Sequence, residues 1–520
     1  MKRKLLGVIL SLAMTISLAA CGSTAEGDGD MAGANASPAV EQKPVIVEAN
    51  YDGIEVKSNG AIVSVHDPSI KVFDGRYYIY GSHMTGAYTD DFQKWTYIGK
   101  TYNDLNPLYD NLFDESLDIF DYAGDNGNGS YSVWASDVIY IEEMQKYVMY
   151  SCVSSTYIKS NLCYLTADAP EGPYTYQGPL LYSGFTSYDI DQTNVYDVVS
   201  EEYAAENYLE LSGSYNNEDW PNCIDPAPFY DEDGRLWMTY GSWSGGIFLL
   251  ELDPDTGLII HPEADPENNV DPYFGKRLMG GGHKSIEGPY IEYNAETGYY
   301  YLYVSYGALQ QQGGYQIRVF RSETPDGEYV DMNGQYHVKG YNHAFYGLKL
   351  SGNYYLPSLK YAYMATGGQS TFTDTDGKNY CCFHSRFEKQ NEYHEPVVKQ
   401  MFFNEEGWPV MAPYSTKGET ISKTGYDMSQ LVGDYYFINQ GTMIDAEIEQ
   451  PVMITLNEDG TVSGSVYGTW TMTEGTCYMH LTYEDIEYSG VFCAMKDQTG
   501  VDVMTFTAVG NNESIWGVKY

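Results

Sequence analysis

The phrase HDPSI at residues 66–70 runs, after a short gap, into DGRYYIYGS at residues 74–82. An acidic residue beside a proline is followed by a tight turn and then by an aromatic strand. The phrase returns as IDP before DEDGRLWMTYGS (224–226 and 231–242) and as IEGP before TGYYYLY (286–289 and 297–303). Repetition at intervals of roughly 60 to 90 residues indicates one β-sheet blade per copy.

Two weaker copies bring the number of blades to five. They read WASDV before KYVMY (134–138 and 146–150) and GGQS before DGKNY (367–370 and 376–380). The sequence therefore predicts an all-β protein with a five-bladed β-propeller over residues 51–422. From residue 425 to residue 520 the phrase is absent and short strands take over, which predicts a separate small antiparallel β-sheet or barrel. Packing and sugar binding are both open as roles for this second domain.

Composition narrows the class of protein and of partner. The chain has 520 residues, of which 43% are hydrophobic, and it contains 53 Tyr and 53 Gly. This length buries a sizeable core, and the residue usage suits β-sheets with many turns. The formal net charge of −44 argues against nucleic acid and anionic lipid as partners. A neutral ligand is the easier interpretation.

The N-terminus is typical of a processed segment. A basic start and a short apolar run make residues 1–20 a predicted secretory signal. The signal ends in LAAC, which resembles a bacterial lipoprotein signal and implies lipidation of Cys21. Residues 21–50 are then a flexible tether, and the protein is expected outside the cell, held at its surface by the lipid on Cys21. The seven other Cys are scattered, which favours buried thiols over disulfides or a metal site.

Three acidic residues stand at the starts of predicted inner strands. Asp67, Asp225 and Glu287 are flanked by apolar residues, whereas Asp74 and similar residues precede glycine in hairpin turns. A propeller brings the first strand of every blade to one axis, so these three carboxyls are expected to occupy equivalent places and to meet in one pocket. Cleavage of a glycosidic bond needs such carboxyls, one as acid and one as base or nucleophile.

These motifs together resemble the signature set of glycoside hydrolase family 43. The resemblance rests on HDPSI at 66–70, WASDV at 134–138, CIDP with GSWSGGI at 223–226 and 241–247, and SIEGPY at 285–290. Within the family the sequence is most similar to the two-domain secreted arabinan endo-1,5-α-L-arabinosidases, and the similarity runs from about residue 60 to about residue 420. The final sheet also resembles the extra β-domain of those proteins.

The resemblance implies an inverting hydrolase with three carboxyls in distinct roles. Asp67 matches the general base, Glu287 the general acid, and Asp225 the residue that orients the acid and raises its pKa. A negative charge near Glu287 would keep it protonated. The implied substrate is a neutral plant polysaccharide, namely arabinan such as that of pectin side chains. No organic cofactor is implied.

Other candidate substrate-binding residues have structural alternatives. Trp134 and Trp243 either stack on sugar rings or pack between blades. Asp137 either binds sugar hydroxyls or satisfies backbone amides. His66 either contacts substrate or only supports the loop of the base, and Arg386 either neutralises the crowded carboxyls or forms a structural ion pair.

The family resemblance also implies one structural calcium ion beneath the site. Related arabinanases carry a His in a Gly-His-Asn phrase of the last blade, where this chain reads GGQS at 367–370. An amide oxygen can ligate calcium, so Gln369 is the candidate metal ligand. The alternative is that Gln369 only binds water and the ion is absent.

Two other functions compete with internal cleavage of arabinan. The first is the same chemistry at chain ends, as an α-L-arabinofuranosidase or a β-xylosidase, and groove shape distinguishes it from internal cleavage. The second is a non-catalytic surface lipoprotein that captures glycans. That function predicts the loss of at least one carboxylate, and none of the three is missing.

Overall fold

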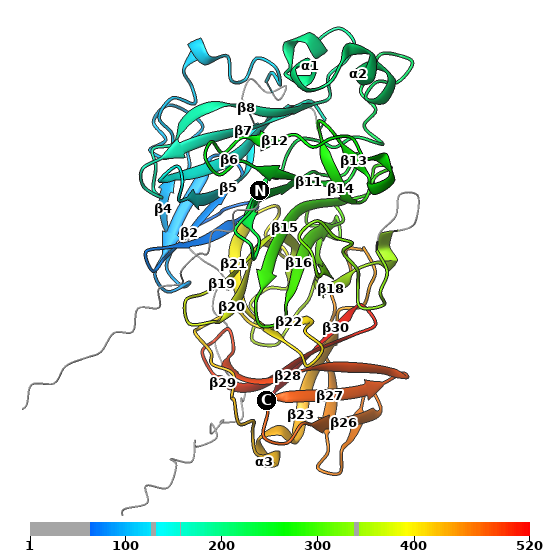
Figure 1. Cartoon of the computed structure of the whole chain (residues 1–520). Helices are drawn as coiled ribbons and strands as arrows, with labels where there is room; N and C mark the ends of the chain where they lie inside the picture. The colour runs from blue at the N-terminus through cyan, green and yellow to red at the C-terminus, as the bar shows by residue number, and fades with distance from the viewer. Residues whose placement is uncertain (1–62, 126–131, 156–157, 337–342) are drawn as a thin grey trace, which may run out of the picture. The chain divides into compact units, whose positions relative to one another are not determined.

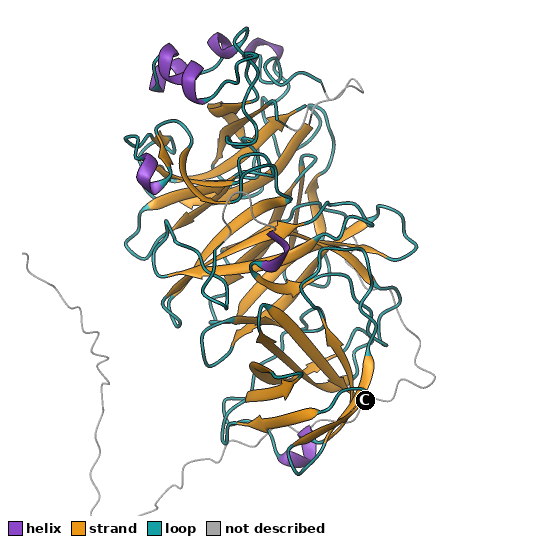
Figure 2. Ribbon diagram, turned by 90° about the vertical axis from the view of Figure 1, so that its right-hand side faces the viewer, coloured by secondary structure: helices purple, strands orange, loops and turns teal. Residues whose placement is uncertain are grey.

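A computed structural model describes residues 63–125, 132–155, 158–336 and 343–520. Strands dominate these residues (Figure 2), and they form five sheets followed by a closed barrel. The first four-stranded sheet contains β1 (Ser69–Phe73), β2 (Arg76–Gly81), β3 (Thr85–Thr89) and β4 (Thr96–Gly99), and the second contains β5 (Ser132–Ile141), β6 (Lys146–Ser154), β7 (Ser160–Ala167) and β8 (Thr175–Ser183).

The third sheet is larger than the others, with six strands. It contains β9 (Ala227–Tyr230), β10 (Leu236–Tyr240), β11 (Ile247–Leu252), β12 (Ile259–Ile260), β13 (Val270–Asp271) and β14 (Gly275–Met279). The fourth and fifth sheets have four strands each: β15 (Ile286–Asn294), β16 (Tyr299–Tyr306), β17 (Gln316–Ser322) and β18 (Leu348–Ser351), then β19 (Tyr363–Thr373), β20 (Asn379–Phe387), β21 (His394–Phe403) and β22 (Pro409–Met411).

The five sheets are the blades of a propeller, coloured from blue to yellow along the chain in Figure 1. The first strands of successive blades contact one another in the order β1, β5, β9, β15 and β19, and β19 returns to β1. Apolar clusters fill the space between blades. One joins Tyr78 and Tyr80 to Val138 and Met149, and another joins Ile70 to Cys382. The predicted five-bladed propeller is therefore confirmed.

The C-terminal strands close into a barrel (orange to red in Figure 1). These strands are β23 (Gly433–Asn439), β24 (Val452–Leu456), β25 (Thr461–Gly464), β26 (Gly468–Met472), β27 (Tyr478–Tyr483), β28 (Ile486–Lys496), β29 (Asp502–Gly510) and β30 (Glu513–Lys519). Of the two forms that the sequence left open, an open sheet or a barrel, the structure has the barrel. Its core is continuous with that of the last two blades, since Leu348 and Phe383 belong to the same buried cluster as Trp516.

Helices are short in the described part of the chain. They are α1 (Val195–Val198), α2 (Glu201–Asn207) and α3 (Met428–Leu431), with 3-10 turns η1 (Glu115–Leu117), η2 (Ile190–Gln192), η3 (Pro266–Asn268) and η4 (His343–Phe345). No helix there has both the length and the apolar character needed to cross a membrane. The predicted signal, Cys21 and the tether lie outside the described residues.

The seven cysteines in the described ranges are all buried free thiols. Cys381 and Cys382 lie side by side in β20 and both are fully buried. Burial raises the pKa of the Cys381 thiol, mainly because desolvation disfavours the thiolate. The prediction of buried thiols in place of a disulfide framework is confirmed for these residues.

Candidate active site

A small cavity of about 40 Å³ lies where the five inner strands meet. Every blade contributes the start of its first strand to the wall, two or three residues at a time. The lining residues are Asp67, Pro68 and Ser69 of the first blade, Ala135 and Asp137 of the second, Asp225, Pro226 and Ala227 of the third, Gly288, Pro289 and Tyr290 of the fourth, and Gly368, Gln369 and Ser370 of the fifth. The predicted axial pocket is therefore present, and it contains Asp67 and Asp225.

One residue of each blade in this wall has left-handed backbone geometry. These residues are Asp67, Ala135, Asp225, Gly288 and Gly368, with φ between 45° and 58°. In three blades a proline follows at once, and it fixes the direction in which the inner strand leaves the axis. Asp and Gly tolerate this conformation better than most residues. The repeated Asp-Pro and Gly-Pro pairs are thus the local signal for the turn into each blade.

This repeat corrects one expectation from the sequence. Gly288, and not Glu287, is the residue equivalent to Asp67 and Asp225, so Glu287 stands one position earlier in its blade. The strand pairing is irregular between Glu287 and Tyr290, as it also is between Trp134 and Asp137 in the second blade. The Glu287 side chain still lies close enough to the other two carboxyls for their charges to interact. The three acids converge although their backbone positions are not all equivalent.

Asp67 is held by donors on several sides. His66 Nδ1 lies 2.6 Å from Asp67 Oδ2, and the Ser82 hydroxyl donates to the same oxygen at 2.6 Å. The Asp67 backbone N–H donates to His384 Nδ1 at 3.2 Å, and that nitrogen lies 3.6 Å from Oδ1. Burial works to raise the pKa of Asp67, but His66, His384 and Ser82 outweigh it and hold the pKa well below its usual range. The side chain is 24% exposed, so this ionised carboxylate is open to the cavity.

Asp225 and Glu287 form a close pair. The backbone N–H of Gly288, next to Glu287, donates to Asp225 Oδ2 at 3.1 Å. The Ser242 hydroxyl donates to Glu287 Oε2 at 2.9 Å, and Tyr315 also bonds Glu287. Burial raises the pKa of both carboxyls; the charge of Glu287 raises that of Asp225 further, and the charge of Asp67 does the same to Glu287.

Both carboxyls of the pair have donors: two hydroxyls bond Glu287, and Asp225 receives one backbone N–H. The two carboxyls titrate as one unit that retains a proton above the usual range for acidic side chains. Nearby Asp67 stays ionised. The site thus combines an ionised carboxylate with a carboxyl pair that retains a proton.

Asp137 is a buried ion-pair partner that also faces the cavity. Its Oδ1 lies 3.0 Å from Lys71 Nζ and accepts from Ser69 and from the Val138 N–H. Burial is the main cause that raises the pKa of Asp137, and Lys71 opposes it. Its Oδ2 has no protein hydrogen-bond partner among the described residues. The structure thus favours a structural charge with one oxygen left for a small polar group in the cavity.

The predicted aromatic and basic contacts lie away from the wall. Trp134 and Trp243 are half-buried and do not line the cavity. Trp243 directly follows Ser242, and its ring centroid lies 5.5 Å from that of exposed His283. Arg386 is 4% exposed and forms an ion pair with Glu392 at 2.6 Å. Of the two interpretations of Arg386, the structural ion pair is present, and the guanidinium also reaches His66 and His384.

Gln369, the predicted calcium ligand, has protein partners at both ends of its amide. Its amide oxygen accepts from Ser305 at 2.8 Å and its amide nitrogen donates to the Gly288 carbonyl at 2.7 Å. Calcium takes six to eight oxygen ligands, and protein groups already use both ends of this amide. His66, Asp67 and His384 have ligand atoms within 4.8 Å of one another, but their nitrogens face hydrogen-bond partners. The calcium ion stays a prediction, and no reaction step is assigned to it.

Two serines in the same sequence phrase serve different carboxyls. Tyr-Gly-Ser ends the second strand in both blades, but the register places Asp67 opposite Ser82 and Asp225 opposite Gly241. The turn between β1 and β2 has two residues and that between β9 and β10 has five, which shifts the phrase by one position. Ser82 therefore bonds Asp67 of its own blade, whereas Ser242 bonds Glu287 of the next. Sequence reasoning missed both.

Gly368 is a further residue that the sequence did not single out for this role. A Cβ atom there would lie 2.3 Å from Asp67 Oδ1 and 2.9 Å from His384 Nδ1. Its φ of +57° also favours glycine. The fifth blade thus leaves room for the carboxylate of the first.

We expect Gly368→Ala to displace Asp67 and to lower kcat/KM, by about 10²-fold for a carboxylate misplaced by roughly 1 Å. Gly377→Ala is the matched control, because Gly377 also has a positive φ of 82° in the same blade but nothing lies within 4 Å of an added Cβ. Steady-state kinetics of the two variants check this. Equal kinetics in both would show that Gly368 does not protect the position of Asp67.

Comparison with known proteins identifies the families and relatives that this chain resembles. A family described as "Glycosyl hydrolases family 43" matches residues 207–409, and one described as "C-terminal lipocalin-like domain" matches residues 413–517. The chain is 37% identical over 473 residues to "Extracellular endo-alpha-(1->5)-L-arabinanase 2" of Bacillus subtilis, covering 88% of this chain and 93% of that protein. A similar protein from Thermotoga petrophila is 36% identical over 88% of this chain and 93% of its own length.

Solved structures agree with the sequence relatives. The crystal structure of endo-1,5-alpha-L-arabinanase from Thermotoga petrophila superposes with a TM-score of 0.77 at 36% identity, over 90% of this chain and 100% of that one. A family 43 glycoside hydrolase from Bacillus licheniformis gives the same TM-score and identity over 89% and 99% of the two chains. The propeller and the barrel are both included in these superpositions.

Proposed function

Because this chain belongs to glycoside hydrolase family 43, we propose that it cleaves internal α-1,5-L-arabinofuranosyl links of arabinan with inversion. The observation that carries the proposal is the convergence of an ionised carboxylate and a proton-holding carboxyl pair at one axial cavity. An inverting glycosidase needs one carboxylate as general base and one protonated carboxyl as general acid. The names of the relatives at 36–37% identity supply the polymer and the bond.

The proposed reaction is a single displacement at the anomeric carbon. Asp67 accepts a proton from a water molecule while the oxygen of that water forms a bond to the anomeric carbon. The bond from that carbon to the glycosidic oxygen breaks on the opposite face. Glu287 gives its proton to the departing oxygen. One water is consumed, the configuration inverts, and Asp67 and Glu287 exchange protons with solvent before the next cycle.

The surroundings of Asp67 suit a base better than an acid. Ser82 and the imidazoles of His66 and His384 stabilise its negative charge, and the lowered pKa keeps it ionised over the whole physiological range. A weakly basic carboxylate gains less driving force for proton transfer, so its contribution rests mainly on holding and orienting the attacking water.

The Asp225 and Glu287 pair suits the acid. Ser242 donates to Oε2 of Glu287 and orients the carboxyl, whose acidic proton is given to the sugar. Gly288 orients Asp225 beside it. In the catalytic form the shared proton is on Glu287, and the ionised Asp225 keeps it there until the glycosidic oxygen takes it.

Asp225→Asn tests this division of roles through the pH profile. In the wild type the last proton leaves the pair only above the usual carboxyl range, because burial disfavours both charges and, in addition, ionised Glu287 repels ionised Asp225. The neutral amide removes that repulsion, so the high-pH limb of kcat/KM should move to lower pH. The low-pH limb, set by Asp67, should stay in place. A high-pH limb that stays unchanged in kinetics over a wide pH range would contradict the pairing.

The same proposal includes the location of the protein. Two relatives are named as extracellular, and a secretory signal ending at Cys21 would carry this chain out of the cell and attach it by lipid. A neutral arabinan would not be repelled by the net charge of −44. Metabolic labelling with a radioactive fatty acid, compared with Cys21→Ser, checks the lipid; equal labelling of both proteins would count against it.

The experiment for the activity is product sizing. The purified protein is incubated with debranched arabinan, and the products are separated by length at early and late times. Internal cleavage gives mixed oligosaccharides first and a rapid fall in viscosity. Arabinose alone from the start would instead support the arabinofuranosidase alternative, and release of xylose from xylo-oligosaccharides the β-xylosidase alternative.

A further inference from the structure

Arg386 lies in β20 of the fifth blade, far from Asp67 in sequence, yet its guanidinium reaches the histidine beside that base. Arg386 Nη2 lies 3.3 Å from His66 Nε2, and Nη1 lies 3.1 Å from His384 Nε2. Arginine can only donate hydrogen bonds. The Nε2 atom of His66 must therefore be the acceptor, and in the neutral ring the hydrogen is then on Nδ1.

That hydrogen lies where Asp67 needs a donor. His66 Nδ1 is 2.6 Å from Asp67 Oδ2, a short distance for a hydrogen bond to a carboxylate. If the hydrogen were on Nε2, it would point at the guanidinium, and the bare Nδ1 would face the carboxylate with its lone pair. Only one tautomer satisfies both neighbours.

We propose that Arg386 is a positioning residue for the base: it holds His66 in the tautomer whose Nδ1–H binds and orients Asp67. The proposal rests on Asp67 being the base of the proposed function. It assigns to Arg386 a role in aligning the base, in place of direct contact with the sugar.

The packing of His66 supports this role. Its ring stacks on His384 with centroids 3.8 Å apart, and His394 meets it edge-on at 5.0 Å. His66 is 7% exposed, so the ring has little freedom to swing away. Ring position is thus set by packing, and the tautomer is set by the groups that face the two nitrogens, Asp67 at Nδ1 and Arg386 at Nε2.

Arg386 is itself anchored. Its Nε donates to Glu392 Oε2 at 2.6 Å, and the Gln311 backbone N–H lies 3.2 Å from the same oxygen. The residue is 4% exposed. A buried guanidinium with one fixed carboxylate partner presents its other nitrogens in a constant direction, here toward the two imidazoles.

Several titratable or charged groups face His66 and Asp67 among the described residues. His66 is faced by Asp67, Arg386, His83, His384 and His394, and Asp67 by His66, His384, Asp225 and Glu287. Burial is the main cause that lowers the pKa of His394 to about 4, and burial also lowers the pKa of His384 well below its usual value. Near neutral pH, where Asp67 is ionised, His384 and His394 are therefore neutral.

The first test reads the tautomer directly. The full chain is labelled with ¹⁵N-histidine, and long-range ¹⁵N–¹H spectra are recorded for the wild type and for His66→Gln, which assigns the His66 signals. We expect Nδ1 to be protonated and Nε2 to be bare. A protonated Nε2 in the wild type would overturn the proposal. Because no substrate is present, this result does not depend on the proposed function.

The second test compares Arg386→Met with Arg386→Lys. In Arg386→Met, Nε2 loses its donor, so the share of the Nδ1–H tautomer should fall, the low-pH limb of kcat/KM should rise by about one pH unit or more, and kcat should fall by roughly 10- to 100-fold, as for residues that orient an active group without touching the substrate. Arg386→Lys, which keeps a donor, should fall between this variant and the wild type. If Arg386→Met does not fold, the Arg386→Lys variant and the wild-type spectrum still test the proposal.

Lys389→Met is the matched control, since it removes one positive charge from the turn after β20 where the side chain is 75% exposed. It should keep the wild-type spectrum and pH profile. An Arg386→Met variant with wild-type pH limbs and an Nδ1–H tautomer would overturn the proposal. Absence of any arabinan cleavage by the wild type would instead count against the proposed function.

Discussion

Asp67→Asn should lower kcat/KM on arabinan by about 10²–10⁴-fold, the range that general acid–base catalysis contributes. The amide keeps the size of the side chain and an oxygen for the Ser82 hydroxyl. It cannot take a proton from water. Asn also tolerates the left-handed backbone at this position, where φ is +50°, so the fold should remain.

Asp74→Asn is the control for this variant. Asp74 also has a positive φ, of 51°, but it lies exposed in the turn between β1 and β2. Both proteins should have the same melting temperature, and only Asp67→Asn should lose activity on every substrate, whatever the leaving group. Near-normal hydrolysis by Asp67→Asn would remove Asp67 from the mechanism.

Glu287→Gln should lose a similar factor on arabinan but not on every substrate. The amide still accepts from Ser242 at the position of Oε2 and cannot donate an acidic proton to the glycosidic oxygen. Arabino-oligosaccharides with an acidic phenol as leaving group need little protonation. Their cleavage should therefore fall much less than that of arabinan, and this contrast separates an acid from a residue that only shapes the pocket.

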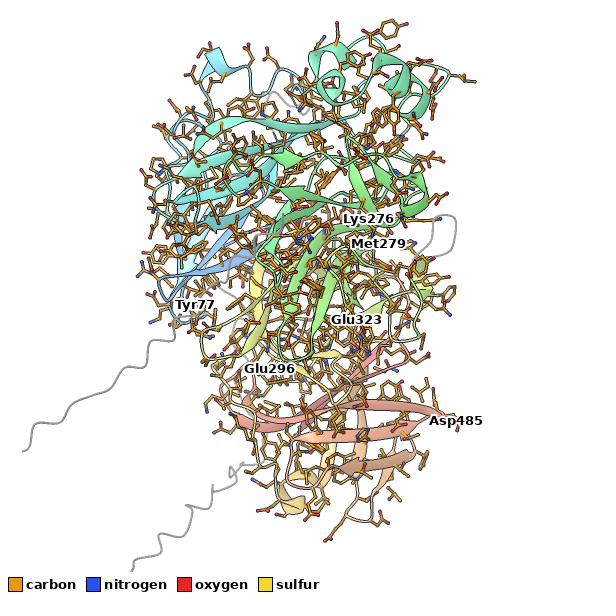
Figure 3. All side chains as sticks on the ribbon, in the orientation of Figure 1. Tyr77, Lys276, Met279, Glu296, Glu323 and Asp485 are labelled. Carbon is orange, nitrogen blue, oxygen red and sulfur yellow. The ribbon has the colours of Figure 1, made fainter. Side chains whose placement is uncertain are left out.

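Glu296→Gln is the matched control. Glu296 lies in the turn that joins β15 and β16 of the same blade, where it is exposed (Figure 3). The ratio of rates on the two kinds of substrate should be unchanged in this variant. If Glu287→Gln loses both activities equally, the acid must be another residue, and Asp225 would be the next to test.

Much of the fold was predictable because the repeat is local. Three copies join an acidic or glycine turn residue to a proline and then an aromatic strand, and steric limits on φ make that combination specific to a sharp turn into a strand. Asp67 and Asp225 were identified in this way. The number of copies predicted the five blades, and the point in the sequence where the copies stop predicted the second β-domain.

The position of Glu287 shows the limit of such reasoning. Its phrase aligns with the others, but the equivalent residue is Gly288, and Glu287 approaches Asp67 and Asp225 from one position earlier in its blade. Likewise Ser82 and Ser242 occupy the same phrase and bond different carboxyls. A one-residue change of register reverses the side of a strand on which a side chain lies, and turn lengths far along the chain set that register.

The chain alone fixed the repeat, the number of blades and the two acids that carry the turn geometry, because short-range sterics and alternation act between neighbours in sequence. The sequence did not show that Arg386, His384 and Gly368 approach Asp67 and its neighbour His66 from the fifth blade. Those contacts exist because the ring of blades closes and brings β19 and β20 against β1. Closure joins residues about 300 positions apart, and no local pattern in the sequence encodes such a distance.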